Sequence, residues 1–339
     1  MIKVGIVGIS GYSGVNTLEI LLKHPGVRVT YVSANNTKGR VSEIWPHLKG
    51  KVALTCTPFD IKKAVKLCDV VFLAVPHTVA MTIAPALLAA NIKVIDFSGD
   101  YRLKNTSDYK KWYGTEHKDS GHLKQSVYGL PELYRANIKK AKLIANPGCY
   151  PTAAILTLAP LIAAHSKNCE SIVIDAKSGV SGAGRRATLN FSFTEVNENF
   201  KAYKVLKHQH APEIDLYLSK ISTKPVSVNF VPHLLPVTRG ILETIYVHLK
   251  KRLSVAAMHK MYTRFYKNEP FIRILPLGQQ PELKHVVKTN YCDIALAMSN
   301  NNKLLVLTST IDNLLKGAAG QAVQNMNLMC GFKETESLL

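Results

Sequence analysis

The chain begins with a short apolar strand, a glycine-rich turn and a helix, and this order restricts the possible folds more than any other feature. Val4–Gly8 forms the predicted strand, the turn is Gly8–Gly14, and the helix runs through Thr17–Leu22. Glycines at such a position let the backbone turn tightly and approach a pyrophosphate, which rests at the helix N-terminus. We therefore predict a dinucleotide site here. Its expected contact residues are Gly8, Ser10, Gly11, Tyr12, Ser13 and Gly14.

The first third of the chain continues this alternation of strands and helices. Continuous β-branched runs separated by helices indicate a parallel sheet covered on both faces. Residues 100–140 are rich in Tyr, Gly, Asp and Lys, and we expect loops there. The expected elements are strands at Val27–Ser33, Val70–Val75 and Val94–Phe97, and helices at Ile61–Leu67 and Ala80–Ala90.

After residue 150 the strands become longer and the helices fewer, which predicts a mixed α+β domain with one exposed sheet face. The last helix, Leu314–Met329, is expected to pack back on the first domain. The predicted class is α/β, with a Rossmann-type nucleotide-binding domain at 1–148 and 313–339 and an inserted α+β catalytic domain at 149–312. The expected elements are strands at Ser171–Ala176, Val226–Val231, Gly240–Lys250, Tyr291–Met298 and Lys303–Thr310, and helices at Thr152–Ala164, from Pro212, and at Ser254–Lys267.

The end of the second predicted strand indicates which nicotinamide cofactor is bound. An NAD enzyme usually carries Asp or Glu there to hold the ribose hydroxyls. This chain has Ser33, followed by Lys38 and Arg40. No carboxylate would repel a 2′-phosphate, and the two cations would neutralise one. We therefore predict NADP, with Ser33, Lys38 and Arg40 among its contacts.

Asn146–Thr152 is the most informative stretch for chemistry. It follows a strand-like segment and precedes a helix, and Pro151 suits the first helical turn. Cys149 is thus placed at a helix N-terminus, where backbone N–H groups and the dipole favour a thiolate. The same N–H groups could hold the oxyanion of a tetrahedral intermediate. We predict that Cys149 is a covalent nucleophile.

A nucleophilic cysteine needs a nearby base, and His208–Ile214 is the best candidate segment. His208 and His210 lie just before the helix that begins near Pro212. With Glu213 they could also bind a metal, but no further ligands are evident, and we predict no metal site. The six cysteines contain no C-x-x-C pair, which argues against zinc and against a secreted disulfide framework.

The chain resembles the N-acetyl-γ-glutamyl-phosphate reductases, the arginine-biosynthesis members of the semialdehyde dehydrogenase group. The resemblance covers essentially the whole chain. The matching motifs are Gly8–Gly14, Asp96–Leu103, Tyr128–Glu132, Asn146–Thr152, Ser178–Arg185, His208–Ile214, Phe230–Gly240 and Asp312–Ala322.

The resemblance implies a layout similar to that of glyceraldehyde-phosphate dehydrogenase and a specific reaction. The Cys149 thiolate would attack the acyl phosphate, and NADPH would reduce the resulting thioester to the aldehyde. The family's base maps to His208, with His210 as second choice. Arg102 would hold the phosphate, and Arg185 or Arg239 the substrate carboxylate. Asn146 and His210 are also expected at the substrate, and Ser181, Gly182 and Asn313 along the cofactor.

Composition leaves two alternatives open. The net charge of +20 suits a small anionic substrate, but it also suits an acyl phosphate attached to an acidic carrier protein, as in a related aminoadipyl or glutamyl reductase. A basic nucleic-acid-binding protein is the remote alternative, because no aromatic-rich basic stripe is present. We expect no nucleic acid partner and no membrane partner. We also expect a cytoplasmic location and a homodimer or homotetramer.

Overall fold

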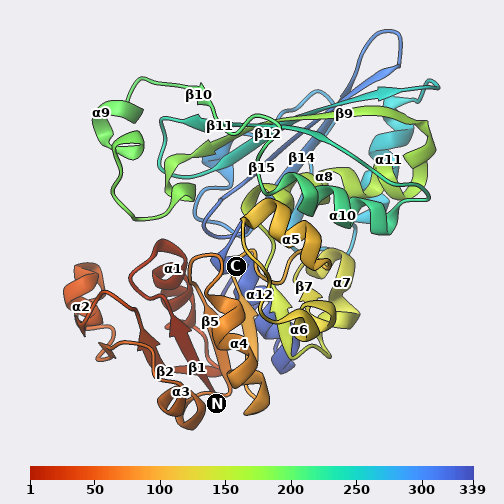
Figure 1. Cartoon of the computed structure of the whole chain (residues 1–339). Helices are drawn as coiled ribbons and strands as arrows, with labels where there is room; N and C mark the ends of the chain where they lie inside the picture. Colours follow the sequence, from red (N-terminus) through yellow and green to blue (C-terminus); the bar gives the residue numbers. More distant parts are fainter. The chain divides into compact units, whose positions relative to one another are not determined.

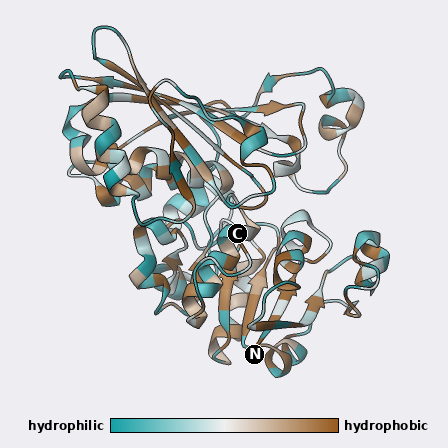
Figure 2. Ribbon diagram, turned by 180° about the vertical axis from the view of Figure 1, so that it is seen from behind, coloured by the Kyte–Doolittle hydropathy of each residue, from teal (hydrophilic) through white to brown (hydrophobic).

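The computed structural model describes residues 1–339, which form two compact units (Figure 1). The first unit comprises Met1–Pro147 and Ala318–Leu339, and the second comprises Gly148–Gly317. Each unit is built on its own sheet, and hydrophobic residues lie on both the strands and the helices (Figure 2). The predicted α/β class, with a parallel sheet followed by a mixed one, is confirmed.

The first unit contains a six-stranded parallel sheet in the order β2-β1-β5-β6-β8-β7. Because every strand points the same way, all carboxyl ends lie at one edge, where ligands bind in open α/β sheets. The strands are β1 (Ile2–Val7), β2 (Val27–Ser33), β5 (Val70–Leu73), β6 (Lys93–Asp96), β7 (Val127–Tyr128) and β8 (Leu143–Ala145). A small pair, β3 (Gly39–Arg40) and β4 (Thr55–Cys56), follows β2 in the chain.

Two hydrophobic clusters cover the two faces of this sheet. One joins the strands to α1 (Tyr12–Leu21) and α12 (Ala319–Cys330), and the other joins them to α3 (Ile61–Leu67) and α4 (Ala80–Ala89). The C-terminal helix therefore belongs to the first unit, although it begins at Ala319 and not at the predicted Leu314. Residues 314–318 instead lie in a turn.

The expectation of loops at 100–140 was wrong in part, because three short helices lie there. They are α5 (Thr106–Tyr113), α6 (Ser120–Gln125) and α7 (Pro131–Ile138). The Asn105 side chain caps α5 by accepting the Ser107 N–H at 2.8 Å. Helices of six to eight residues with mixed polarity show too few turns for a clear 3.6-residue period, so their sequence resembles a loop.

The second unit contains a seven-stranded mixed sheet in the order β10-β11-β9-β12-β15-β14-β13. The β9–β11 and β13–β14 pairs are parallel and the other pairs antiparallel. The strands are β9 (Cys169–Gly179), β10 (Lys201–Ala202), β11 (Asn229–Leu235), β12 (Ile241–Leu249), β13 (Ile272–Ile274), β14 (Cys292–Met298) and β15 (Leu304–Ile311). Shorter helices are α2 (Val41–Ile44) in the first unit and α9 (Phe193–Val196) in the second.

Two helices pack against strands of the mixed sheet, α8 (Cys149–His165) and α11 (Val255–Phe265), and α10 (Ala211–Ile221) packs against α8. Along β12, buried residues alternate with half-buried ones, as expected for a sheet covered on one face. The segment Cys149–Asn168 is long and apolar enough to cross a membrane, but 78% of its most hydrophobic window is buried inside the unit. It is the central core helix.

Glu243 on β12 is an unusual member of the covered face. It is fully buried, and neither carboxylate oxygen has a hydrogen-bond partner. Ser309, its direct neighbour on β15, is also fully buried with a hydroxyl that lacks a partner. Burial raises the pKa of Glu243 well above its ordinary value of 4.5. The folded protein therefore holds this carboxyl group in its neutral form at pH values where the unfolded chain ionises it.

This difference makes stability depend on pH at Glu243. Below about pH 4.5 both states are protonated, and above it only the unfolded state ionises, so folding stability falls as pH rises towards the folded pKa. We expect Glu243→Gln to remove this loss. The variant's advantage in unfolding free energy should grow as the pH rises above about 5, by up to about 1.4 kcal/mol per pH unit, until the folded pKa of Glu243 is reached. Denaturant titrations at four pH values measure it.

Glu170→Gln is the matched control, because Glu170 is an exposed carboxylate on β9 of the same sheet. Its difference from the wild type should stay constant across the pH series. Parallel stability curves for Glu243→Gln and the wild type would contradict the prediction.

Candidate active site

The glycine-rich turn of the first unit is so tight that only glycine fits at two positions. Gly8 has φ +100°, and an added Cβ would lie 2.0 Å from the carbonyl oxygen of Ala74. An added Cβ on Gly14 would lie 2.3 Å from the Gly8 oxygen. The Gly8 and Ile9 N–H groups both donate to the Ser33 carbonyl, at 2.7 and 3.1 Å. The ends of β1, β2 and β5 thus fix a turn that fits a dinucleotide pyrophosphate.

Trp45 supports this turn from a distant part of the chain, which sequence reasoning missed. Its Nε1–H donates to the Ile9 carbonyl at 2.9 Å, and its ring centroid lies 6.4 Å from that of Tyr12. Gly11 is the N-cap of α1, with extended backbone angles. The predicted contacts Ser10, Gly11, Tyr12 and Ser13 are all half-buried, so part of each remains accessible at the helix start.

The predicted cations of the 2′-phosphate site lie on either side of Gly39. Lys38 and Arg40 are both exposed. Ser33 is fully buried, and its carbonyl accepts the N–H groups of Gly8 and Ile9 in the glycine-rich turn. Glu43, the nearest acidic residue along the chain, accepts the Arg40 backbone N–H at 2.8 Å and so caps the short helix α2. The arrangement leaves two exposed positive charges a few residues beyond β2.

Arg102 and Asn146 form one buried assembly at the carboxyl edge of the parallel sheet. Arg102 is 5% exposed; its Nε–H donates to the Asn146 carbonyl at 2.9 Å and an Nη2–H to the Phe97 carbonyl at 2.6 Å. Asn146 is fully buried, and its N–H donates to the Asp96 carbonyl at 2.8 Å. Arg102 therefore holds the backbone three residues before Cys149.

The Asp96 carboxylate lies in the same assembly. Its oxygens accept the backbone N–H and the hydroxyl of Ser98, both at 2.8 Å. Burial, followed by the negative charge of Asp100, raises the pKa of Asp96 to about 7. Asp100 in turn accepts the N–H groups of Thr78 and Met81, at 2.7 and 3.0 Å. The two carboxylates thus organise the loops that follow β5 and β6.

In the second unit, Cys149 is the first residue of α8, as predicted. It is half-buried, and the preceding Gly148 is the N-cap. The Gly148 N–H donates to Oε1 of the fully buried Glu213 at 2.9 Å. The sequence had offered Glu213 only as a metal ligand. Its carboxylate instead fixes the backbone directly before Cys149, and the helix dipole favours a thiolate at this position.

Aromatic rings surround the two histidines beside this helix start. The ring centroid of Tyr150 lies 5.8 Å from those of His208 and His210, and the two histidine rings lie 4.6 Å apart. Tyr203 is 5.6 Å from His208, and its hydroxyl lies 3.1 Å from that of Tyr150. Phe230 closes the cluster at 5.5 Å from His208. His208 is 5% exposed and His210 is 9% exposed.

The two tyrosines of this cluster have raised pKa values. Burial raises the pKa of Tyr203 to about 12, and the charge of the nearby Cys149 thiolate adds to the rise. The same charge contributes to the raised pKa of Tyr150, after burial and the influence of Tyr203. Tyr150 directly follows Cys149 in the chain, and its hydroxyl contacts that of Tyr203, so the segment that carries Cys149 is joined to the tyrosines around His208. Sequence reasoning missed Tyr203, which lies in no recognisable motif.

The hydrogen bond to His208 fixes its neutral tautomer. The backbone N–H of His210 points at Nδ1 of His208, at 3.1 Å. An amide N–H can only donate, so Nδ1 accepts and the neutral ring carries its proton on Nε2. His208 is therefore arranged as a hydrogen-bond donor through Nε2.

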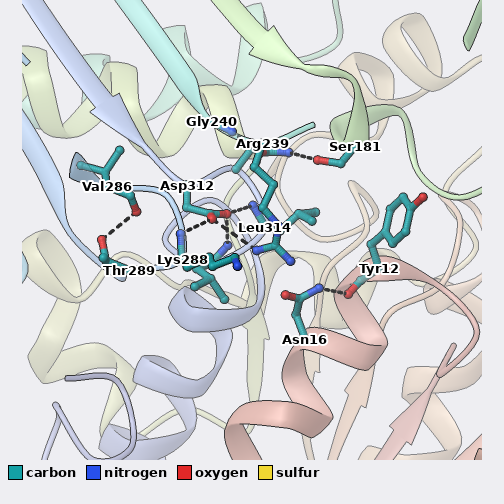
Figure 3. A network of polar contacts seen from close by, with 12 residues as sticks. Tyr12, Asn16, Ser181, Arg239, Gly240, Val286, Lys288, Thr289, Asp312 and Leu314 are labelled. Carbon is teal, nitrogen blue, oxygen red and sulfur yellow. Dashed lines mark hydrogen bonds and ion pairs between the residues drawn. The ribbon is translucent and has the colours of Figure 1, made fainter. Parts of the chain in front are cut away.

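A turn after β15 organises several other predicted residues (Figure 3). Oδ2 of Asp312 accepts the Lys288 N–H at 2.7 Å and lies 3.3 Å from Nη1 of Arg239. Asn313 accepts the Gly240 N–H at 2.8 Å and donates to the Ser181 hydroxyl at 3.0 Å. Arg239, Ser181 and Asn313 are thus held together. Arg185 and Gly182 lie in an exposed stretch beyond Ser181.

Two family profiles match the chain. Residues 3–141 match the family described as semialdehyde dehydrogenase, NAD binding domain, and residues 149–313 match semialdehyde dehydrogenase, dimerisation domain. A nicotinamide cofactor domain followed by a dimerisation domain is therefore the family architecture.

Full-length relatives carry a common name. The chain is 48% identical to the N-acetyl-gamma-glutamyl-phosphate reductase of Desulfotalea psychrophila, over 100% of this chain and 98% of the relative. It is 46% identical to that of Pelotomaculum thermopropionicum, over 99% and 97%. Among solved structures, aspartate semialdehyde dehydrogenase II of Vibrio cholerae has a TM-score of 0.71 at 17% identity, covering 98% of both chains. The Candida albicans aspartate semialdehyde dehydrogenase with NADP has a TM-score of 0.72 at 14% identity, covering 97% and 98%. These two show the shared fold.

Proposed function

The chain belongs to the N-acetyl-γ-glutamyl-phosphate reductase family, and from this premise we propose that it reduces N-acetyl-glutamyl 5-phosphate to N-acetyl-glutamate 5-semialdehyde and phosphate, a step of arginine biosynthesis. The observation that carries the proposal is Cys149 at the first position of α8, beside a cluster that holds His208. A thiol at a helix start with a fixed imidazole nearby suits covalent acyl transfer.

In the proposed reaction the Cys149 thiolate attacks the acyl carbon, and the bond to phosphate breaks to leave a thioester. When bound at the glycine-rich turn, the nicotinamide cofactor would supply the hydride needed to reduce this thioester. The resulting tetrahedral oxyanion collapses to the aldehyde and returns the electron pair to sulfur, which regenerates the thiolate. The proton that the overall reaction consumes goes to the departing phosphate. Sulfur therefore cycles between thiolate and thioester without a proton of its own.

His208 serves this cycle as a hydrogen-bond donor. Because Nδ1 accepts the His210 N–H, the proton of the neutral ring is on Nε2, and Nε2–H would donate to the carbonyl oxygen as negative charge develops on it. A neutral imidazole can act in this way without transferring its proton. The base role predicted from the sequence needs an unprotonated Nε2 and therefore loss of the His210 contact. His210 remains the second candidate, 4.6 Å away between ring centroids.

The anionic ends of the substrate need guanidinium donors. Arg239 suits the substrate carboxylate, because Asp312 holds it in place before substrate arrives. Arg185 is exposed and is the alternative. Arg102 stays the predicted phosphate ligand, and its bond to the Asn146 carbonyl gives it a second effect on the backbone that leads to Cys149.

We propose NADP as the cofactor of the first unit. The cradle at Gly8 and Gly14, which any Cβ would fill, fits a pyrophosphate. Lys38 and Arg40 are exposed beyond β2, where a 2′-phosphate would be recognised. We further propose a cytoplasmic enzyme that acts on the free substrate and assembles as a homodimer or homotetramer through residues 149–313. Exposed apolar side chains favour such assembly: Leu189, Phe193 and Phe200 are 76%, 79% and 54% exposed.

Cys149→Ser tests the central claim, since a hydroxyl at this position does not ionise as a thiol does. We expect kcat to fall at least about 1,000-fold, with NADPH affinity unchanged. The assay follows NADP reduction with free N-acetylglutamate semialdehyde and phosphate, and Cys330→Ser is the control. Wild-type turnover on the free compound removes the need for a carrier protein, and near-normal turnover of Cys149→Ser would refute the proposal.

His208→Gln separates donor from base. The glutamine side-chain amide can donate where Nε2–H does but cannot take up a proton. We therefore expect kcat of His208→Gln to be about 10-fold or more higher than kcat of His208→Ala, and its pH profile to match that of the wild type. Equal inactivity of the two variants would favour the base role instead. Initial rates from pH 6 to 9 give both results.

The cofactor assignment is tested by the double variant Lys38→Ala/Arg40→Ala. We expect kcat/KM with NADPH to fall about 10-fold or more and kcat/KM with NADH to change little, because only NADPH carries the 2′-phosphate. Lys62→Ala/Lys63→Ala, an exposed pair on α3, is the control. A wild-type preference for NADH, or equal losses with both cofactors, would contradict the assignment.

A further inference from the structure

One residue that lies close to the Cys149 side chain, although far from it in the sequence, is a glycine. An added Cβ on Gly317 would lie 2.9 Å from the Cβ of Cys149. Real Cβ contacts are essentially never that short, so the bare backbone of Gly317 lies against the nucleophile. Gly317 does not have a positive φ, which means that close approach, and not backbone conformation, requires glycine here.

The backbone of Gly317 is held firmly. Its N–H donates to the Asp312 carbonyl at 2.9 Å, which closes the turn. Oδ1 of Asp312 accepts the N–H groups of Leu314 and Leu315, at 2.7 and 3.0 Å. The Asn313 side chain anchors the same turn to Gly240. An added Cβ at position 317 would also lie 2.6 Å from the carbonyl oxygen and 2.9 Å from the Cα of Asn313, inside the same turn. Because the turn is held in place, a methyl group there would press on both the Asn313 backbone and Cys149.

We propose that Gly317 is a positioning residue: its bare backbone closes one side of Cys149 and sets the location of the sulfur. The same turn holds Arg239 through Asp312, so the nucleophile and the proposed carboxylate ligand are positioned by one rigid segment. This inference rests on the proposed function for its kinetic consequence. The close contact between Gly317 and Cys149 does not depend on the proposed function.

Displacement of the sulfur affects the reacting distance more than binding. Misplacement of a reacting group by about 1 Å can cost about 100-fold in rate. We therefore expect Gly317→Ala to lower kcat by roughly that factor, with little change in substrate KM or NADPH affinity. Gly121→Ala is the matched control, because an added Cβ at Gly121 in α6 meets no atom within 4 Å.

A direct steric test uses stability and needs no activity. The decrease in Tm caused by Gly317→Ala is measured in three backgrounds: wild type, Cys149→Ala and Cys149→Gly. Cys149→Ala keeps the Cβ, so the loss of Tm should match that in the wild type. Cys149→Gly removes the Cβ, so the loss should shrink, which is the coupling that a double-mutant cycle detects. The rate of iodoacetamide labelling of Cys149 across pH gives an independent view of the sulfur in Gly317→Ala.

The outcomes decide the proposal in every case. A smaller cost in the Cys149→Gly background, together with altered labelling of Cys149, supports it. An equal cost in all three backgrounds means that the methyl group meets only the Asn313 backbone, at 2.6 Å, and overturns it. Failure of Gly317→Ala to fold even with Cys149→Gly overturns it too. If the wild type lacks reductase activity, the proposed function fails while the stability cycle still tests the contact.

Discussion

The hydrogen bond between the Gly148 N–H and the buried Glu213 carboxylate is the contact on which the proposed chemistry of the second unit depends. It ties the first turn of α10 to the start of α8. The His208 and His210 rings just before α10 are thereby placed beside Tyr150, the residue after Cys149. A charge-assisted bond to a buried backbone group is strong and costly to break, because either partner would be left unsatisfied. The Glu213 carboxylate thus fixes the backbone directly before Cys149.

The first unit fixes the same stretch of chain from its other end. Because all six strands are parallel, the segments after β1, β5, β6 and β8 meet at one edge of the sheet. There Arg102 holds the Asn146 carbonyl, and the Asp96 carbonyl accepts the Asn146 N–H. The chain then continues through Pro147 to Gly148. Asn146 is therefore fixed within the first unit by Arg102, and Gly148 is fixed within the second unit by Glu213.

The sequence allowed prediction of features whose cause is local. The turn at Gly8 and the helix start at Cys149 each follow from a few adjacent residues, and both were confirmed as structural features. Contacts between distant residues could not be predicted. Trp45 reaches Ile9 across 36 positions, and Tyr203 lies in a stretch without periodicity. The tautomer of His208 also depends on a backbone N–H whose direction no motif specifies.

Asp312, directly after β15, and Glu243, on β12, are both buried but differ in whether hydrogen bonds compensate their burial. Asp312 is fully buried, and its oxygens meet three backbone N–H groups and the Arg239 guanidinium, so its charge is compensated and stiffens the turn against Cys149. Glu243 is equally buried, but its oxygens have no partner, and the folded state holds it neutral. A neutral unpaired group stiffens nothing and costs stability. The compensated carboxylate of this pair is thus the one that fixes the turn beside Cys149, where the proposed reaction would be sensitive to small displacements of the sulfur.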